Sequence, residues 1–199
     1  MEGKAQSVLG LLDVSDLGRT LCHEHLLINA EALHVEPEPQ YKDESEAEVD
    51  NLENLHWLRY FPYSNKRNLH VVENAILEKE LNWYKQVGGQ TIVDVTITGL
   101  RPELPGDSQT YAESLADLSR KTNVNIICGT GFYVDHVHPE FVSQASVDDL
   151  AAFMVNEITE GIDGNKDIRA GVIGEIGCSW PLTDNEIKVR NQKMKLQVL

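Results

Sequence analysis

The sequence predicts an α/β fold in which about four parallel strands alternate with helices. Short runs rich in β-branched residues alternate along the chain with amphipathic segments, and capping-box patterns stand before three of these segments. Strict alternation of this kind implies a parallel sheet joined by right-handed crossovers. The 199 residues, of which 41% are hydrophobic and 25% are charged, can form one domain with a substantial core.

The first predicted strand lies within residues 18–28, an apolar run that contains the sequence His-Glu-His. Residues 31–67 then form an irregular excursion that is rich in carboxylates and contains Pro37 and Pro39. Such a composition favours exposed backbone over a core element. We therefore expect a long, exposed loop between the first strand and the first helix.

Three further strands and four helices are predicted after this excursion. A helix should follow Asn68 and end at Gly88-Gly89. At about 100° per residue, its apolar face would consist of Val72, Ile76, Trp83 and Val87. Strands are expected at residues 91–97, 124–129 and 170–176. Each is followed by a capping box that predicts a helix start, namely Thr110-x-x-Glu113, Ser146-x-x-Asp149 and Thr183-x-x-Glu186, with the last helix running to Leu199.

Two architectures suit this order of elements, an open doubly wound sheet and a (β/α)₈ barrel. A dinucleotide-binding sheet would carry GxGxxG after its first strand, and a P-loop would carry GxxxxGK[ST]. Neither motif occurs in the sequence, which weighs against the open sheet. A complete barrel, however, needs eight strands and usually about 250 residues, so four predicted units make up only half of one.

The charge balance excludes several classes of partner. Seventeen basic residues stand against 32 acidic ones, which gives a formal net charge of −15, so the chain repels phosphate backbones and anionic lipid surfaces. We expect no binding to nucleic acid. No apolar run reaches the roughly 18 residues needed to span a bilayer, and no membrane partner is expected. Three cysteines without a CxxC pair indicate reduced thiols and a cytoplasmic protein.

The strongest candidate site is His23-Glu24-His25 at the end of the first predicted strand. Residues i and i+2 of a strand point to the same side, so both imidazoles would face one direction and could form half of a Zn²⁺ site. Glu175 lies inside an otherwise apolar strand, where a metal ion would compensate its charge. Structural explanations remain open for both: the histidine spacing also arises by chance, and Glu175 could pair with Arg19 or Arg169.

Other polar residues carry weaker signals. Asp94 lies within the second predicted strand, where a structural hydrogen bond is expected. His136 and His138 repeat the His-x-His spacing, but Pro139 follows and the flanks are polar, so we expect a surface loop. Tyr133 follows the third strand and is a candidate substrate contact.

Three motifs resemble those of the phosphotriesterase-related proteins, a branch of the amidohydrolase superfamily. They are Leu17-Gly-Arg-Thr-Leu-Cys-His-Glu-His-Leu26, the Gly129-Thr-Gly-Phe-Tyr133 turn and Ile173-Gly-Glu-Ile-Gly-Cys-Ser-Trp-Pro181, and the similarity runs from about Gly3 to about Val189. Members of this family are (β/α)₈ barrels. The resemblance therefore implies that residues 1–199 form one partial hydrolase domain, the N-terminal half of a TIM-like (β/α)₈ barrel.

The resemblance also implies a ligand set. Family members hold two divalent metal ions, usually zinc, with the first-strand His-x-His on one ion and a fourth-strand residue bridging both. Carried over to this sequence, His23 and His25 are metal ligands and Glu175 is the bridge. The family's later ligands, histidines on strands five and six and an aspartate on strand eight, have no counterpart after Pro181. No catalytic residue is therefore assigned, and at most one weakly bound ion is expected, with acidification releasing it.

The implied activity of the full-length form is hydrolysis of a small-molecule amide or ester by a metal-bound hydroxide. N-acyl taurines such as N-acetyltaurine are among the substrates associated with the glutamate-bridged branch, whereas the family name suggests phosphotriesters. This chain alone is expected to be inactive. The alternative function is that of a non-catalytic half-barrel that acts through self-association or partner binding.

Half a barrel leaves the first and fourth strands with unpaired backbone groups. Its inward-facing side chains are expected to form an exposed apolar surface made of Val93, Val95, Ile126 or Ile127, and Ile173. We therefore expect a homo-oligomer formed through the exposed barrel edges and no stable monomer.

Overall fold

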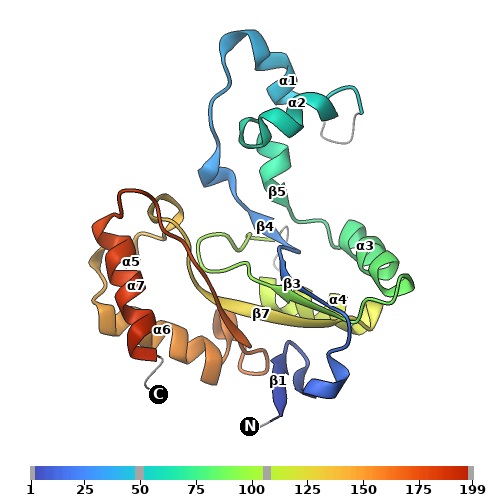
Figure 1. The fold of residues 1–199 in the computed structure, drawn as a ribbon, viewed down its shortest axis with the longest axis vertical. Helices are drawn as coiled ribbons and strands as arrows, with labels where there is room; N and C mark the ends of the chain where they lie inside the picture. Colours follow the sequence, from blue (N-terminus) through green and yellow to red (C-terminus); the bar gives the residue numbers. More distant parts are fainter. Residues whose placement is uncertain (1–2, 48–51, 105–108, 197–199) are drawn as a thin grey trace.

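The computed structural model describes residues 3–47, 52–104 and 109–196, and it contains the predicted parallel sheet. Four strands are arranged in the order β3-β6-β7-β8, and every neighbouring pair is parallel. Their bounds are β3 (Thr20–Glu24), β6 (Thr91–Asp94), β7 (Asn125–Phe132) and β8 (Val172–Ile176). The sheet is curled into half of a barrel, with β3 and β8 at its two edges (Figure 1). The predicted fold class is confirmed.

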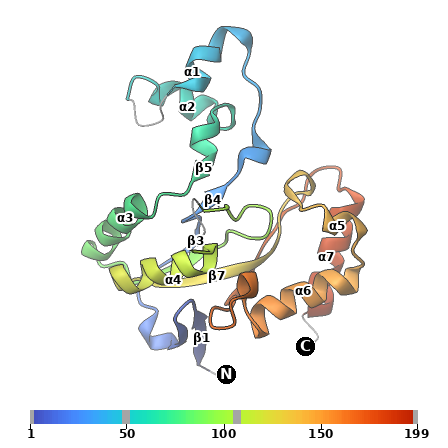
Figure 2. The same cartoon turned by 180° about the vertical axis from the view of Figure 1, so that it is seen from behind.

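One long helix follows each strand, as the alternation predicts. These helices are α3 (Asn74–Gln86), α4 (Tyr111–Thr122), α6 (Val147–Thr159) and α7 (Asp184–Leu196). Thr110 and Ser146 form complete capping boxes with the residues three positions later, and Thr183 and Glu186 exchange the same pair of hydrogen bonds at the start of α7. Figure 2, which views the molecule from behind, shows α4 in front of β7, so this helix covers the outer face of the sheet.

The largest part of the core lies between this outer face and the helices α3 and α4. Its members are buried apolar side chains from β6, β7 and both helices, including Leu77, Leu81, Ile92, Leu115, Leu118 and Ile126. Burying a side chain of this size stabilises the fold by about 1.5–3 kcal/mol. A second cluster, which includes Phe132, Leu150, Met154 and Val189, joins β7 to α6 and α7. The two clusters fix the curvature of the sheet from its convex side.

The predicted apolar face of α3 is wrong, although the helix itself is confirmed. Leu77 and Leu81 are buried, whereas Ile76 and Trp83 are 52% and 50% exposed. The helix has two adjacent apolar arcs, one with Leu77 and Leu81 and one with Ile76 and Trp83. Periodicity alone could not predict which of them faces the sheet. The exposed arc lies on the side of α3 that has no neighbouring helix among the residues the structure describes.

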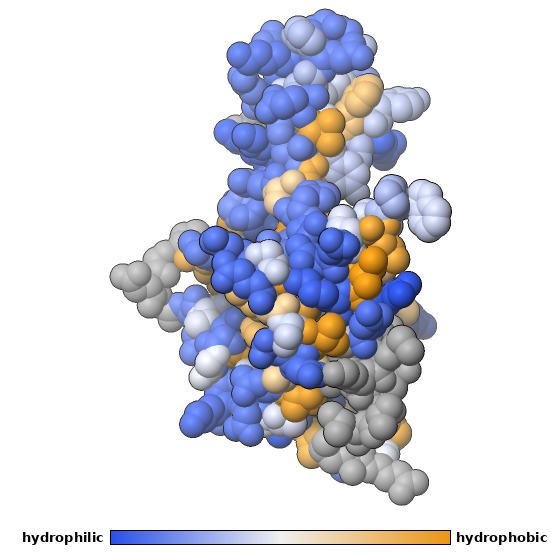
Figure 3. All heavy atoms as spheres, turned by 90° about the vertical axis from the view of Figure 1, so that its left-hand side faces the viewer, coloured by the Kyte–Doolittle hydropathy of each residue, from blue (hydrophilic) through white to orange (hydrophobic). Residues whose placement is uncertain are grey.

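The described residues between positions 31 and 67 form a lobe that projects from one end of the sheet (Figure 1). The lobe leaves and rejoins the body through the antiparallel pair β4 (Ile28–Asn29) and β5 (His70–Val71). The predicted loop is wrong in its described part, which contains short helices, namely η2 (Glu31–Leu33), η3 (Pro39–Tyr41), α1 (Lys42–Glu46), α2 (Leu55–Tyr60), η4 (Pro62–Ser64) and η5 (Lys66–Leu69). Buried Trp57 and Leu58 give the lobe apolar packing of its own. The face of the lobe drawn in Figure 3 is mostly hydrophilic, as predicted, but Val35, Leu52 and Tyr60 are exposed hydrophobic side chains.

The N-terminal residues form a β-hairpin that the sequence analysis did not predict. Strands β1 (Lys4–Ser7) and β2 (Gly10–Asp13) pair in antiparallel fashion, and η1 (Val14–Asp16) leads into β3. The backbone N–H of Val8 donates to the carbonyl oxygen of Ile126, which attaches the hairpin to β7. The remaining elements are η6 (Asp135–Val137), α5 (Phe141–Gln144) and η7 (Ile162–Gly164). No described helix is both long and apolar enough to cross a bilayer.

The concave face exposes less apolar surface than predicted. Val95 and Ile127 are buried, and only Val93 and Ile173 of the expected set are partly exposed. Gly171, just before β8, lies against both the N-terminal hairpin and Ile127, because a Cβ atom there would be 2.1 Å from the carbonyl oxygen of Gln6 and 2.7 Å from Cγ2 of Ile127. The expectation of a fully open interior is therefore corrected for the middle of the sheet.

Candidate metal centre

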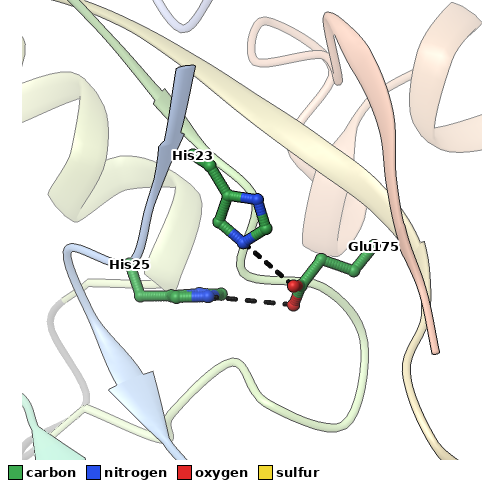
Figure 4. A group of neighbouring side chains, drawn as sticks. All are labelled: His23, His25 and Glu175. Carbon is green, nitrogen blue, oxygen red and sulfur yellow. Dashed lines mark ion pairs between the residues drawn. The ribbon is translucent and has the colours of Figure 1, made fainter. Parts of the chain in front are cut away.

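His23, His25 and Glu175 come together at the carboxyl ends of β3 and β8 (Figure 4). Nε2 of His23 lies 3.0 Å from one carboxylate oxygen of Glu175, and Nε2 of His25 lies 3.7 Å from the other. Each residue offers one possible ligand atom, and these three atoms all lie within 4.8 Å of one another. Because β3 and β8 are the two edge strands, only the curl of the sheet brings these residues into contact.

The three side chains differ in their exposure to solvent. The His23 side chain is 60% exposed, whereas that of Glu175 is only 19% exposed. The imidazole edges of His23 and His25 meet in a T-shaped arrangement with ring centroids 5.6 Å apart. The group is therefore anchored on the Glu175 side and open to water on the His23 side.

A hydrogen-bonded relay orients His25. Its Nδ1 lies 3.0 Å from the hydroxyl oxygen of Thr96, and that hydroxyl also bonds to the carboxylate of Asp94. The Thr96 oxygen can accept from Nδ1–H of His25, and in that tautomer the Nε2 lone pair is directed at the site. Groups of this kind fix the tautomer of metal-binding histidines.

Asp94 holds the surrounding backbone in place, which confirms the structural hydrogen bonding expected for it. Its carboxylate accepts from the backbone N–H groups of Leu26 and Thr96 and from the hydroxyl of Tyr111. Burial raises the pKa of Asp94, and these hydrogen bonds counteract part of that effect. The sequence analysis missed Thr96, although the polar pair Asp94 and Thr96 in a β-branched run was the signal that could have found it.

The donor set suits a divalent metal ion. Two imidazole nitrogens and one carboxylate oxygen are the protein ligands of several catalytic zinc sites. The donor atoms lie close enough together for one ion to contact all three residues. The sequence prediction that these residues converge is confirmed, and their role as metal ligands stays a prediction.

Tyr133 lies at the same end of the sheet. Partial burial and the nearby charge of Glu175 raise the pKa of its phenol. Its ring packs against the apolar cluster that includes Leu69, Ile97 and Leu100, and its carbonyl oxygen is 2.8 Å from Nε2 of His138. The His138 side chain is buried where it contacts the Tyr133 carbonyl oxygen, so the prediction of a surface position is wrong for this residue. His136 is exposed, as predicted.

Glu186 ties together the loops that follow β7 and β8. Its buried carboxylate accepts from the backbone N–H groups of Asp135, Ser179 and Thr183 and from the Ser179 hydroxyl. Burial acts to raise its pKa, but these hydrogen bonds outweigh that effect and lower the pKa from 4.5 to about 2. The loop after β8 also packs closely on Tyr133, because a Cβ atom on Gly177 would lie 2.7 Å from its ring.

The fold and this group of residues define the class of protein. A curled parallel sheet with polar side chains at the carboxyl ends of its strands is the arrangement of β/α-barrel proteins, whose sites lie at that end. The sequence matches the Phosphotriesterase family over residues 3–196. The chain belongs to this family.

Two named relatives and one solved structure support this assignment. An N-acetyltaurine hydrolase from Danio rerio is 42% identical over 190 residues, which cover 95% of this chain and 52% of that protein. A phosphotriesterase-related protein from Nematostella vectensis is also 42% identical, with 94% and 51% covered. The crystal structure of a resiniferatoxin-binding protein from Rhodobacter sphaeroides superposes with a TM-score of 0.90 at 34% identity, over 98% of this chain and 52% of that one. The chain spans about half the length of the curated relatives it matches.

Proposed function

We propose that this chain carries the metal-binding half of a hydrolase site that acts on amide or ester bonds. The observation that carries the proposal is the convergence of His23, His25 and Glu175 from opposite edges of the sheet. Membership of the Phosphotriesterase family supports hydrolysis as the reaction. Zinc is the ion that best suits two imidazoles and one carboxylate.

Each residue has a defined role in this proposal. His23 and His25 would hold the ion through Nε2, and Glu175 would supply its carboxylate ligand. Thr96 and Asp94 hold the His25 ring in the tautomer that leaves Nε2 free. A bound divalent ion supplies Lewis acidity, which lowers the pKa of water and stabilises negative charge on a substrate oxygen. Tyr133, which lies near Glu175, is positioned to contact the substrate.

The proposed substrate class is a small N-acyl amide. Relatives named N-acetyltaurine hydrolase, at 41–42% identity, favour N-acetyltaurine and similar N-acyl taurines over phosphotriesters. Because only one three-donor group is found among the described residues, we expect the 199-residue chain alone to show no turnover above background. Three free cysteines fit the reducing cytoplasm, where we place the protein.

Zinc titration calorimetry at pH 7.5 tests the metal site. We expect one weakly bound ion per chain, and binding should be lost in His25→Ala and in Glu175→Ala. Thr96→Val removes the hydroxyl at nearly constant volume and should weaken zinc binding about 10- to 100-fold, as losses of such supporting groups do. His136→Ala is the matched control, because His136 is exposed and lies outside the group.

Two results would contradict the proposal. Zinc binding that survives in Glu175→Ala would show that the ion binds elsewhere, and equal losses in His136→Ala would show that histidine removal acts nonspecifically. The expectation of inactivity is tested separately with amide and ester substrates in the presence of zinc. Turnover by the isolated chain that disappears in Glu175→Ala would refute that expectation.

The alternative function is that of a non-catalytic half-barrel that acts through association. The observation that favours it is the exposure of β3, which is solvent-exposed at every position except Glu24. Zinc stoichiometry separates the two functions, because a purely structural half-barrel requires no ion.

A further inference from the structure

Tyr111 is a buried tyrosine behind the candidate metal centre. It is the first residue of α4, and the capping box formed by Thr110 and Glu113 fixes where this helix begins. Tyr111 is only 3% exposed and belongs to the core between α4 and the sheet. Its hydroxyl donates to Oδ1 of Asp94 at 3.1 Å and lies 3.3 Å from the carbonyl oxygen of Thr96. One hydroxyl therefore holds both ends of the short segment from Asp94 to Thr96.

The Tyr111 phenol is fixed both in its protonation and in its place. Burial, with a further contribution from the Asp94 carboxylate, raises the pKa of this phenol well above its usual value, so its hydroxyl remains a donor. The Arg101 guanidinium lies 5.5 Å from the centre of the ring. Arg101 is itself held by the carboxylate of Glu157 and by the carbonyl oxygen of Gly129 in β7. The ring thus packs beside a buried cation that is anchored to two other elements.

The segment that Tyr111 holds also contacts a proposed metal ligand. The Thr96 hydroxyl lies 3.0 Å from Nδ1 of His25. The Thr96 backbone N–H donates to Oδ1 of Asp94, the same oxygen that accepts from Tyr111. Oδ2 of Asp94 accepts from the backbone N–H of Leu26, the residue that follows His25. These groups form one connected network of hydrogen bonds that runs from α4 to the His25 ring.

We propose that Tyr111 is a positioning residue that fixes the tautomer of His25 by holding Asp94 and Thr96 in place. In the tautomer so fixed, the Thr96 oxygen accepts from Nδ1–H of His25, and the Nε2 lone pair is available to a metal ion. The consequence for metal binding rests on the proposed function, which makes His25 a ligand. Without the Tyr111 hydroxyl, the segment from Asp94 to Thr96 loses an anchor and His25 populates both tautomers.

Tyr111→Phe isolates the hydroxyl from the rest of the side chain. The substitution keeps the ring, its packing in the core and its contact with Arg101, and it removes only the oxygen. Asp94 retains two donors in this variant, the backbone N–H groups of Leu26 and Thr96. Its carboxylate is therefore not left without hydrogen bonds, and the chain is expected to fold.

Nitrogen-15 NMR of the metal-free chain at pH 8 reads the tautomer of His25 directly. We expect the proton on Nδ1 in the unaltered chain and a mixture of both tautomers in Tyr111→Phe. Thr96→Val, which removes the group that contacts His25, should give a similar mixture.

Tyr84→Phe is the matched control. The Tyr84 hydroxyl donates to the carbonyl oxygens of Arg19 and Thr91 at the amino ends of β3 and β6. The control therefore removes a tyrosine hydroxyl that joins the same two strands at their opposite end. It should leave the tautomer of His25 unchanged.

Zinc titration calorimetry tests the consequence for metal binding. Tyr111→Phe should weaken zinc binding about 2- to 10-fold, the size expected for the loss of one hydrogen bond. Because Tyr111 acts through Thr96, adding Tyr111→Phe to Thr96→Val should weaken binding no further. Tyr84→Phe should leave zinc binding unchanged. Additive losses in the double variant would point to a general structural role and would overturn the proposal.

The tautomer is measured without metal, so the proposal and the proposed function can fail separately. An unaltered chain that binds no zinc would contradict the proposed function, whereas the tautomer of His25 still decides the role of Tyr111. A proton on Nε2 of His25 in the unaltered chain would overturn that role, and this result does not depend on the folding of any variant. An unchanged tautomer in Tyr111→Phe, or an equal change in Tyr84→Phe, would overturn it as well.

Discussion

Replacing Glu186 with glutamine should destabilise the fold by about 2 kcal/mol. Four hydrogen bonds reach this carboxylate, three at Oε2 and one at Oε1, and all four partners donate. A glutamine side chain has only one accepting oxygen. If that oxygen takes the place of Oε2, the amide NH₂ faces the backbone N–H of Asp135, and this N–H loses its acceptor. An unsatisfied N–H costs about 1–3 kcal/mol, and the remaining bonds lose their charge assistance.

The pH dependence of this difference is fixed by the lowered pKa of Glu186. A carboxyl group whose pKa falls from 4.5 when unfolded to about 2 when folded stabilises the folded state fully above pH 4.5. That stabilisation is lost as the pH falls through about 2. Glutamine does not titrate, so the difference in unfolding free energy between the two proteins should shrink between pH 4.5 and 2.

Urea unfolding followed by circular dichroism measures this difference, at one fixed protein concentration and at pH 7 and pH 3. The control is Glu160→Gln, an exposed residue at the end of α6, which should change the unfolding free energy by less than about 0.5 kcal/mol. A Glu186→Gln protein as stable as the unaltered chain at pH 7 would refute the reasoning. A difference of the same size at pH 7 and pH 3 would refute the part that rests on the pKa.

Two further predictions concern buried polar groups. Burial raises the pKa of the Cys128 thiol to about 12. A thiol reagent at pH 8 should therefore label exposed Cys22 and Cys178 in the native chain and reach Cys128 only after unfolding. Rapid labelling of all three cysteines would contradict the burial of Cys128. Arg101→Met should cost about 3–5 kcal/mol, because it leaves Glu157 buried without its cation, and the double variant with Glu157→Gln should recover part of the loss in urea unfolding. A single variant as stable as the unaltered chain would show that this ion pair contributes nothing.

Local patterns predicted the elements well, because helix caps and β-branched runs act over a few residues. Ser146 and Asp149 form the capping box that their spacing predicts. The buried face of α3 could not be predicted, since it depends on which side of the helix meets the sheet and α4. Leu77 and Ile76 are adjacent in sequence and similar in hydrophobicity, yet only the first is buried. Tertiary position decides between them.

The sequence could predict the part of the candidate site that depends on residue spacing within one strand, but not the contacts between strands. The His23 and His25 spacing places both rings on one side of β3, and this is what the structure shows. Thr96 could not be assigned to His25 from sequence, because their contact joins the residues that follow β3 and β6 and depends on strand register. The 3.0 Å contact between His23 and Glu175 depends on the curvature of the whole sheet.

Because the lobe joins the sheet through one short strand pair, its length and sequence can change without disturbing the sheet. Ile28 and Val71 are direct partners in the β4–β5 pair, and the Ala30 N–H donates to the carbonyl oxygen of Leu69, so the two ends of the lobe are adjacent. Lengthening or shortening a segment whose ends already meet costs little closure entropy, about 0.6 kcal/mol per doubling of its length. Insertions, deletions and sequence drift in residues 31–67 are therefore nearly uncoupled from the register of β3 and β6.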